Sequence, residues 1–194
     1  MKSSLNFLCL FFLLLMGNSA FGQSGTESKS KKSDLGIDVS AAIRLPFGNF
    51  NSTHFIGVGI ELSPSYPTVR LESKIKIAFT YNGGIAYYPG KKETVSGYQY
   101  TYPGYIFLHA FAGVLFIPSK NGGLTFPSQK IEISLTGGPA LGIYNGNTRF
   151  NLGSKMELNY HLNDKLSIGP GIIFMKESGA GPLWAASLKV TMAF

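Results

Sequence analysis

Alternation of apolar and polar residues is the dominant pattern of this chain, and it continues to the carboxy terminus. Apolar side chains occupy every second position there, at Leu188, Val190, Met192 and Phe194. The residues between them are polar, charged or small, at Ser187, Lys189, Thr191 and Ala193. Successive side chains of a β-strand point to opposite faces, so this period of two predicts a strand with one apolar and one polar face.

The same period recurs upstream and predicts eight strands that follow one another along the chain. Their expected ranges are 34–45, 56–62, 69–88, 104–117, 131–143, 149–162, 165–174 and 183–194. The segments between them contain Pro, Gly, Asn and Asp, which are typical of turns. Asn163 and Asp164, for example, predict a two-residue hairpin loop. We therefore expect an all-β chain without helices after the amino-terminal segment.

Charged residues sharpen the prediction for the third segment, residues 69–88. Its apolar positions are Val69, Leu71, Ile75, Ile77 and Phe79, and its charged positions are Arg70, Glu72, Lys74 and Lys76. A helix would scatter these charges around its circumference, whereas one continuous strand gathers them on a single face. The fourth segment, 104–117, is apolar on both faces, which leaves its register open, and we place His109 on the inner face.

The first 22 residues have the features of a secretory signal peptide. Lys2 provides a positive start, an apolar run extends from Leu5 to Met16, and small residues follow in Asn18–Gly22. We expect cleavage after Gly22, where the small residues lie. The apolar run is shorter than the roughly 20 residues of a membrane-spanning helix, which favours a cleaved signal peptide. An uncleaved anchor helix is the alternative. Residues 23–33, with lysines among Ser and Gly, predict a disordered basic tail.

Composition narrows the possible functions of the exported chain. Its one cysteine, Cys9, lies in the signal segment, so the mature chain is expected to have no disulfide. The 17 Lys and Arg outnumber the 10 Asp and Glu, but they are dispersed, and an exported chain rarely meets nucleic acid. We expect the partners of these basic residues to be outer-membrane lipid and lipopolysaccharide, which carry negative charge. We do not expect the chain to bind nucleic acid.

The number of strands predicts which ends of the strands meet. An even number of antiparallel strands places both chain ends on one side. The connections after the first, third, fifth and seventh strands then share the opposite side, and the longest of them is Pro89–Pro103. Long loops on one side and shorter turns on the other are typical of outer-membrane barrels.

Three features predict that the apolar face points outward to lipid rather than inward. Charged residues make up 14% of the chain, against about 25% in soluble domains. Glycines gather on the polar face, where a narrow lumen needs room, at Gly57, Gly59, Gly138, Gly142, Gly153, Gly169 and Gly171. Aromatic residues gather near strand ends, as in membrane girdles, at Tyr66, Tyr81, Tyr87, Tyr88, Tyr105, Tyr144, Trp184 and Phe194. A soluble periplasmic β-barrel or sandwich that binds a small ligand is the alternative.

With this strand rhythm, signal segment and terminal Phe194, the chain resembles small eight-stranded outer-membrane proteins of the OmpA/OmpX type. It is similar in particular to the outer-membrane β-barrel domain family of Bacteroidetes, over residues 34–194. The resemblance implies a monomeric, antiparallel up-and-down transmembrane β-barrel. It also implies that Phe194 belongs to the signal by which the outer-membrane assembly machinery recognises its clients.

The polar faces of the expected strands would place charges of both signs in the lumen. The acids are Asp34, Asp38, Glu61, Glu72, Glu132 and Glu157. The bases are Arg44, Arg70, Lys74, Lys76, Lys130, Arg149, Lys155, Lys165 and Lys189. An eight-stranded barrel is only wide enough for its own side chains, so we expect a packed salt-bridge network that closes the lumen. A narrow polar conduit or an anion site around Lys74 and Lys76 is the alternative.

Candidate catalytic and metal-binding residues are sparse. Small barrels that process lipid A acyl chains use His with Ser and an acid near the outer rim. Here His54 lies beside Ser52, but no carboxylate is close in sequence. The other histidines, His109 and His161, are scattered, so we expect neither a metal site nor a cofactor.

The longest expected loop contains the residues that best suit an interaction surface. Tyr98, Tyr100 and Tyr102 form an aromatic tip, although their alternation also suits a strand that prolongs a hairpin above the membrane. Lys91, Lys92 and Lys176 could attract the phosphates of lipopolysaccharide. The sequence thus predicts a non-enzymatic barrel with a structural or surface-interaction role. A narrow transport barrel or a lipid-handling enzyme is the alternative.

Overall fold

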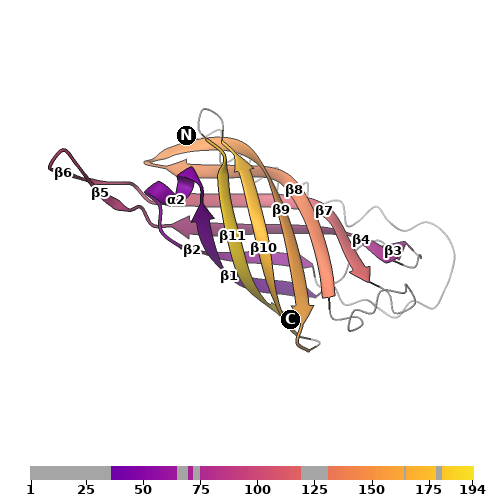
Figure 1. Ribbon diagram of the computed structural model, residues 1–194. Helices are drawn as coiled ribbons and strands as arrows, with labels where there is room; N and C mark the ends of the chain where they lie inside the picture. Colours follow the sequence, from indigo (N-terminus) through magenta and orange to yellow (C-terminus); the bar gives the residue numbers. More distant parts are fainter. Residues whose placement is uncertain (1–35, 65–69, 72–74, 119–130, 164, 178–180) are drawn as a thin grey trace. The chain divides into compact units, whose positions relative to one another are not determined.

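The computed structural model describes residues 36–64, 70–71, 75–118, 131–163, 165–177 and 181–194 (Figure 1). The predicted signal peptide and basic tail lie outside these residues. Eight long strands form the sheet: β1 (Ile37–Phe47), β2 (Gly57–Pro64), β4 (Ile75–Tyr88), β7 (Tyr105–Pro118), β8 (Ile131–Tyr144), β9 (Asn147–His161), β10 (Leu166–Lys176) and β11 (Leu183–Ala193).

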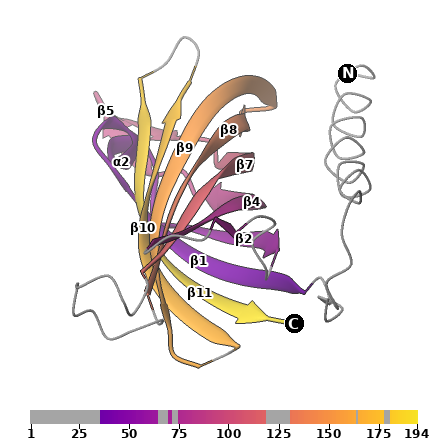
Figure 2. The same ribbon diagram turned by 90° about the vertical axis from the view of Figure 1, so that its right-hand side faces the viewer.

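Every one of these strands is antiparallel to both of its neighbours, and the sheet closes on itself. Strands that follow one another in this series are paired, including β2 with β4, and β1 pairs with β11 to complete the circle. Figure 2 shows the strands wrapping around a common axis. The predicted all-β, eight-stranded, up-and-down barrel is confirmed.

The two ends of the barrel differ in what lies on them. Asp38, near the start of β1, pairs with Ala193, the last residue of β11. The first strand therefore begins and the last strand finishes at the same end of the barrel, which we call the terminal end. At the other end, the loop end, lie a short helix, α2 (Asn49–Thr53), and a separate hairpin of β5 (Lys92–Val95) and β6 (Tyr98–Thr101). The described residues contain no helix with the length and apolarity needed to cross a bilayer.

Two expectations about the elements are wrong. Residues 69–88 do not form one strand, because β3 (Arg70–Leu71) pairs antiparallel with the start of β4, Leu71 opposite Ile77. Both arms of a hairpin alternate in polarity, so the alternation could not reveal the reversal between them. Helix α2 also contradicts the expectation of a chain without helices after the signal segment.

Side chains alternate between a buried interior and an exposed apolar exterior. On β11, the outward Trp184, Leu188, Val190 and Met192 are 37–51% exposed, while the inward Ala185, Ser187, Lys189 and Thr191 are at most 9% exposed. His109 points inward and is buried, as expected. The exterior is therefore apolar and the interior carries the charges, which is the reverse of a soluble barrel.

Inward-facing glycines leave the space that large inward side chains occupy. Glu61 lies directly opposite Gly84 on the neighbouring strand, and Glu157 lies directly opposite Gly171. A Cβ atom on Gly84 would lie 2.8 Å from the Glu61 side chain, and one on Gly171 would lie 2.9 Å from that of Glu157. The lumen is narrow enough that each buried carboxylate requires a residue without a side chain across from it.

Two adjacent glycines on β4 test this requirement. Gly84→Ala should lower the free energy of unfolding by about 1–3 kcal/mol, because its Cβ would overlap the backbone of Ile60 as well as Glu61. Gly83→Ala should change it by less than about 0.5 kcal/mol, because its Cβ would meet only the His109 carbonyl oxygen at 3.6 Å. Urea unfolding of the barrel in lipid vesicles measures both, and equal effects would contradict a packed lumen.

Candidate functional site

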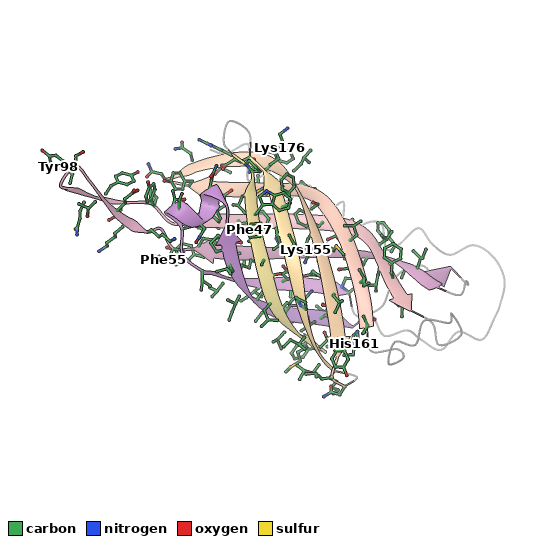
Figure 3. The ribbon with its side chains drawn as sticks, in the orientation of Figure 1. Phe47, Phe55, Tyr98, Lys155, His161 and Lys176 are labelled. Carbon is green, nitrogen blue, oxygen red and sulfur yellow. The ribbon has the colours of Figure 1, made fainter. Side chains whose placement is uncertain are left out.

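Five charged side chains from four strands meet in the middle of the lumen, and we call them the central ion cluster. They are Arg44 on β1, Glu61 on β2, Lys155 and Glu157 on β9, and Lys189 on β11. Figure 3 shows Lys155 midway along the barrel. The cluster therefore spans the lumen between strands that are not neighbours in the sheet.

The central ion cluster is a continuous chain of alternating charges. Arg44 Nη2 donates to Glu61 Oε1 at 2.5 Å, and Lys155 Nζ donates to Glu61 Oε2 at 2.7 Å. Lys155 Nζ also lies 3.1 Å from Glu157 Oε2, to which Lys189 Nζ donates at 2.7 Å. Each carboxylate thus joins two cations, which offsets the cost of removing all five groups from water.

An apolar layer separates the central ion cluster from the loop end. Along β7, Tyr105, Phe107 and His109 point inward in succession and are all buried. The Phe107 ring lies 5.6 Å from the guanidinium carbon of Arg44, and His109 Nε2 lies 3.7 Å from Glu61 Oε1. Buried apolar side chains from four other strands complete the layer: Ala86, Ala140, Ile173, Met175, Leu183 and Ala185.

Helix α2 and the residue after it pack against inward-facing aromatic rings at the loop end, and we call Phe50, His54, Tyr88 and Tyr105 the aromatic plug. The Phe50 ring lies 4.5 Å from that of His54, 5.0 Å from that of Tyr88 and 5.5 Å from that of Tyr105. His54 is buried, with Nδ1 2.8 Å from Thr53 Oγ1 and Nε2 3.2 Å from the Pro103 carbonyl oxygen. These contacts fasten the β1–β2 connection to the base of the β5–β6 hairpin.

The terminal end is polar and holds a partly enclosed cavity of about 110 Å³. Asp38 and Glu132 line it, and Glu132 Oε2 lies 3.1 Å from His161 Nε2. Glu157 and Lys189 of the central ion cluster also line it. From loop end to terminal end, the lumen thus contains an aromatic plug, an apolar layer, an ion cluster and a polar cavity.

The structure brings together some of the residues expected in the lumen and separates others. Asp38 and Glu132 line the terminal cavity, apart from the central ion cluster. Arg70 lies in β3, outside the eight barrel strands, and Lys76 lies in β4 with its side chain outside the described part. Arg149 and Lys165 are exposed, and Arg149 pairs with Glu177 at 3.5 Å. The remaining expected charges, Asp34, Glu72, Lys74 and Lys130, lie outside the described residues.

Sequence reasoning missed the aromatic plug and the apolar layer. Phe50 lies between Asn49 and Asn51 in the connection from β1 to β2, and only the tertiary structure shows that it packs against Tyr88 at the barrel mouth. Phe107 and Phe111 point inward on a strand that is apolar on both faces, so no alternation distinguished them. An aromatic residue between two asparagines was the one available signal for the plug.

The candidate catalytic pair does not form a nucleophile and base. The Ser52 hydroxyl donates to the Asn49 carbonyl oxygen at 2.6 Å, within the same helical turn. Both ring nitrogens of His54 are engaged with Thr53 and Pro103, as described above. Activation of a serine requires a hydrogen bond to the base, and His54 makes its hydrogen bonds elsewhere.

The expected loop tyrosines lie on the β5–β6 hairpin, which turns through Ser96 and Gly97, both with positive φ. Tyr98 is 82% exposed and Tyr100 is 51% exposed. The Tyr102 hydroxyl donates to Glu93 Oε2 at 2.7 Å, which raises the pKa of Tyr102. The terminal Phe194 is also exposed, and its backbone N–H donates to the Ile37 carbonyl oxygen.

Comparison with solved structures finds the same fold in other barrels. The outer membrane enzyme PagL has a TM-score of 0.53 at 13% identity, over 80% of this chain and 98% of that one. The Yersinia pestis outer membrane protein Ail in a nanodisc has a TM-score of 0.50 at 11% identity, over 83% and 100%. Ail in complex with the heparin analogue sucrose octasulfate has a TM-score of 0.50 at 11% identity, over 82% of this chain and 97% of that one. No protein-family model and no curated protein matches the chain by sequence.

The central ion cluster predicts unequal effects of two conservative substitutions. Glu61→Gln should lower the free energy of unfolding by about 3–5 kcal/mol, because it leaves Arg44 buried without its counter-charge and leaves Lys155 to share Glu157 with Lys189. Glu177→Gln breaks only the pair with the exposed Arg149 and should cost at most about 1 kcal/mol. Urea unfolding in vesicles measures both, and a Glu61→Gln barrel of wild-type stability would show that the cluster contributes nothing.

The burial of His54 leads us to expect that the stability of the barrel decreases in mild acid. Burial lowers the pKa of His54; the hydrogen bond to Pro103 opposes this shift, and the positive charge of Lys91 adds to it. The unfolded chain, with a His pKa near 6.5, then binds more protons than the folded one at mildly acid pH. The contribution of neutral His54 is therefore present above about pH 6.5 and is lost as the pH falls below that value.

The measurement is the free energy of unfolding at about pH 7.5 and about pH 5, either side of the ordinary His pKa. The wild type should lose more stability on acidification than His54→Gln, whose side chain does not titrate. Equal losses in the two proteins would contradict a neutral, buried His54.

Proposed function

We propose that the protein is a non-enzymatic outer-membrane β-barrel, exported by the signal peptide of residues 1–22, with a lumen closed to solutes. In this proposal its role is structural or depends on surface interaction through the β5–β6 hairpin. The proposal combines the fold, the apolar exterior and the contents of the lumen, which the next paragraphs take in turn.

The exterior supports a place in the membrane. Residues such as Ile43, Val58, Leu152 and Met156 are more than half exposed and point away from the barrel axis. Six of the eight barrel strands have 11 to 14 residues, against the roughly 9–11 that a tilted strand needs to cross a bilayer. The solved barrels PagL and Ail are both described as outer-membrane proteins, and they share this fold.

The central ion cluster is the observation that carries the closed lumen. It joins β1 and β2 to β9 and β11 by direct ion pairs across the interior, and its side chains are at most 9% exposed. The apolar layer and the aromatic plug lie in series with it toward the loop end. A solute would have to displace all three layers, and separating buried charges from their partners is costly.

The engagement of Ser52 and His54 supports a non-enzymatic role. PagL is described as an enzyme, but at 13% identity it shares only the fold with this chain. Among the interactions of the described residues, His54 pairs with no carboxylate. A serine or cysteine hydrolase needs its nucleophile beside a base that a third group orients, and among the described residues of the loop end Ser52 and His54 do not form such a set.

The hairpin supports a role in surface interaction. One face of β5–β6 carries Tyr98, Tyr100 and Tyr102 with Glu93, and Figure 1 shows the hairpin extending beyond the barrel strands. Exposed tyrosines offer large, stiff contact areas. In this proposal the barrel is a monomer whose partners are outer-membrane lipid, lipopolysaccharide and, through Phe194, the assembly machinery.

Planar-bilayer recording tests the closed lumen. Purified protein, shown to be folded by heat-modifiable gel migration, should produce no stepwise conductance, because the three layers leave no aqueous path. A general diffusion porin, added afterwards to the same membrane, provides the positive control. Discrete and reproducible channel events from the folded barrel would contradict the proposal and favour the transport alternative.

A further inference from the structure

Three aromatic rings form a continuous row on the outer surface of the barrel, where the first and last strands pair. Trp184 on β11 lies directly opposite Phe47 on β1 and, on its other side, directly opposite Phe174 on β10. The ring centroids of Trp184 and Phe47 are 5.9 Å apart, and those of Trp184 and Phe174 are 4.5 Å apart. We call these three residues the aromatic row. It lies outside the lumen, so the closed lumen proposed above does not account for it.

The aromatic row lies near the loop end of the barrel and faces its surroundings. Phe47 is the last residue of β1, and Trp184 is the second residue of β11. Phe47 is 39% exposed and Trp184 is 37% exposed. Aromatic rings at this place on a membrane barrel mark the boundary between the hydrocarbon of the bilayer and its headgroups.

Lys176 continues the outward face of β10 from the aromatic row toward the loop end. It lies two residues beyond Phe174, which is about 7 Å along a strand. Met175 between them is buried in the lumen, whereas Lys176 is exposed and lies opposite the outward-facing Leu152 of β9. Figure 3 labels Lys176 and Phe47, each at the loop end of its strand. If the row marks the hydrocarbon boundary, the ammonium group lies at the level of the headgroups.

The charge of Lys176 is available to a partner outside the chain. Among the described residues, the acid next to it, Glu177, pairs with Arg149 at 3.5 Å, and no ion pair engages Lys176. Lys91 also lies over an exposed ring at the loop end, but it already donates to the Asn51 side chain at 3.3 Å. Lys176 thus combines an outward position, a neighbouring apolar surface and an unused positive charge.

We propose that the aromatic row and Lys176 form an external binding site for the lipid A part of lipopolysaccharide. The site rests on the outer-membrane location proposed above and assigns one of its lipid partners to named residues. The rings contact the acyl chains, and the Lys176 ammonium group donates to a phosphate in a charge-assisted hydrogen bond. The long hairpin lies at the same end, and long loops of outer-membrane barrels are extracellular. The occupant is therefore a lipid of the outer leaflet.

The fluorescence of Trp184 reports on this site directly, because the chain contains one tryptophan. The folded protein is placed in vesicles of brominated phosphatidylcholine, whose bromine atoms quench a tryptophan that they contact. A second, unbrominated lipid is then added, and the recovery of fluorescence measures how well that lipid displaces the first from Trp184. The added lipids are lipid A, lipid A stripped of its phosphates, and phosphatidylglycerol. Lipid A should displace about fivefold more effectively than its stripped form, which is the contribution of one lysine near anionic headgroups.

Two matched substitutions assign the preference to Lys176. Lys176→Gln keeps most of the side-chain length but removes the charge, so lipid A and its stripped form should displace equally well. Lys165→Gln makes the same change at an exposed lysine of the terminal end, and it should retain the preference of the wild type. Heat-modifiable migration shows that each variant is folded.

Three results would overturn the site: equal displacement by lipid A and its stripped form, a preference that persists in Lys176→Gln, or displacement by phosphatidylglycerol as effective as that by lipid A. The initial quenching separates this inference from the proposal on which it rests. If brominated phosphatidylcholine does not quench Trp184, the exterior does not face lipid, and both the site and the membrane barrel are contradicted. A quenched Trp184 without a preference for lipid A contradicts the site alone.

Discussion

The narrowness of an eight-stranded barrel is the constraint on which the rest of this structure depends. Its interior has room only for side chains, so each charge placed there must find its partner among the other side chains of the lumen. Glu61 and Glu157 meet this demand by joining Arg44, Lys155 and Lys189 into one chain of ion pairs. Gly84 and Gly171 lie opposite the two acids and leave the space that they occupy. Charge pairing and glycine placement are two parts of one packing solution.

The interior then becomes a sequence of layers with different chemistry. Apolar and aromatic side chains pack together at the loop end, where Phe50 contacts His54 and Tyr88. The ion cluster lies in the middle, and polar groups including Asp38 and Glu132 line the cavity at the terminal end. Because the layers are in series, the two ends of the barrel differ in chemistry. One end carries an exposed hairpin, and the other contains a polar cavity.

Much of this arrangement follows from alternation in the sequence, and the remainder depends on contacts that alternation cannot describe. The eight strands and their outward apolar faces were predictable because the side-chain period of a strand is two. The same period placed Arg44, Glu61 and Lys155 on polar faces, but which charges meet depends on strand register around the circle. The reversal between β3 and β4 was hidden because both arms of a hairpin alternate. The aromatic plug was hidden because Phe50 acquires its burial only from tertiary contacts.

The central claim is that an apolar exterior and a charged, packed interior make this chain a membrane barrel. Cell fractionation combined with heat-modifiable gel migration tests it most directly. The protein should be found in the outer-membrane fraction and should migrate faster before boiling than after, because the closed barrel resists detergent. A protein recovered in the soluble periplasmic fraction, with the same migration before and after boiling, would contradict the account.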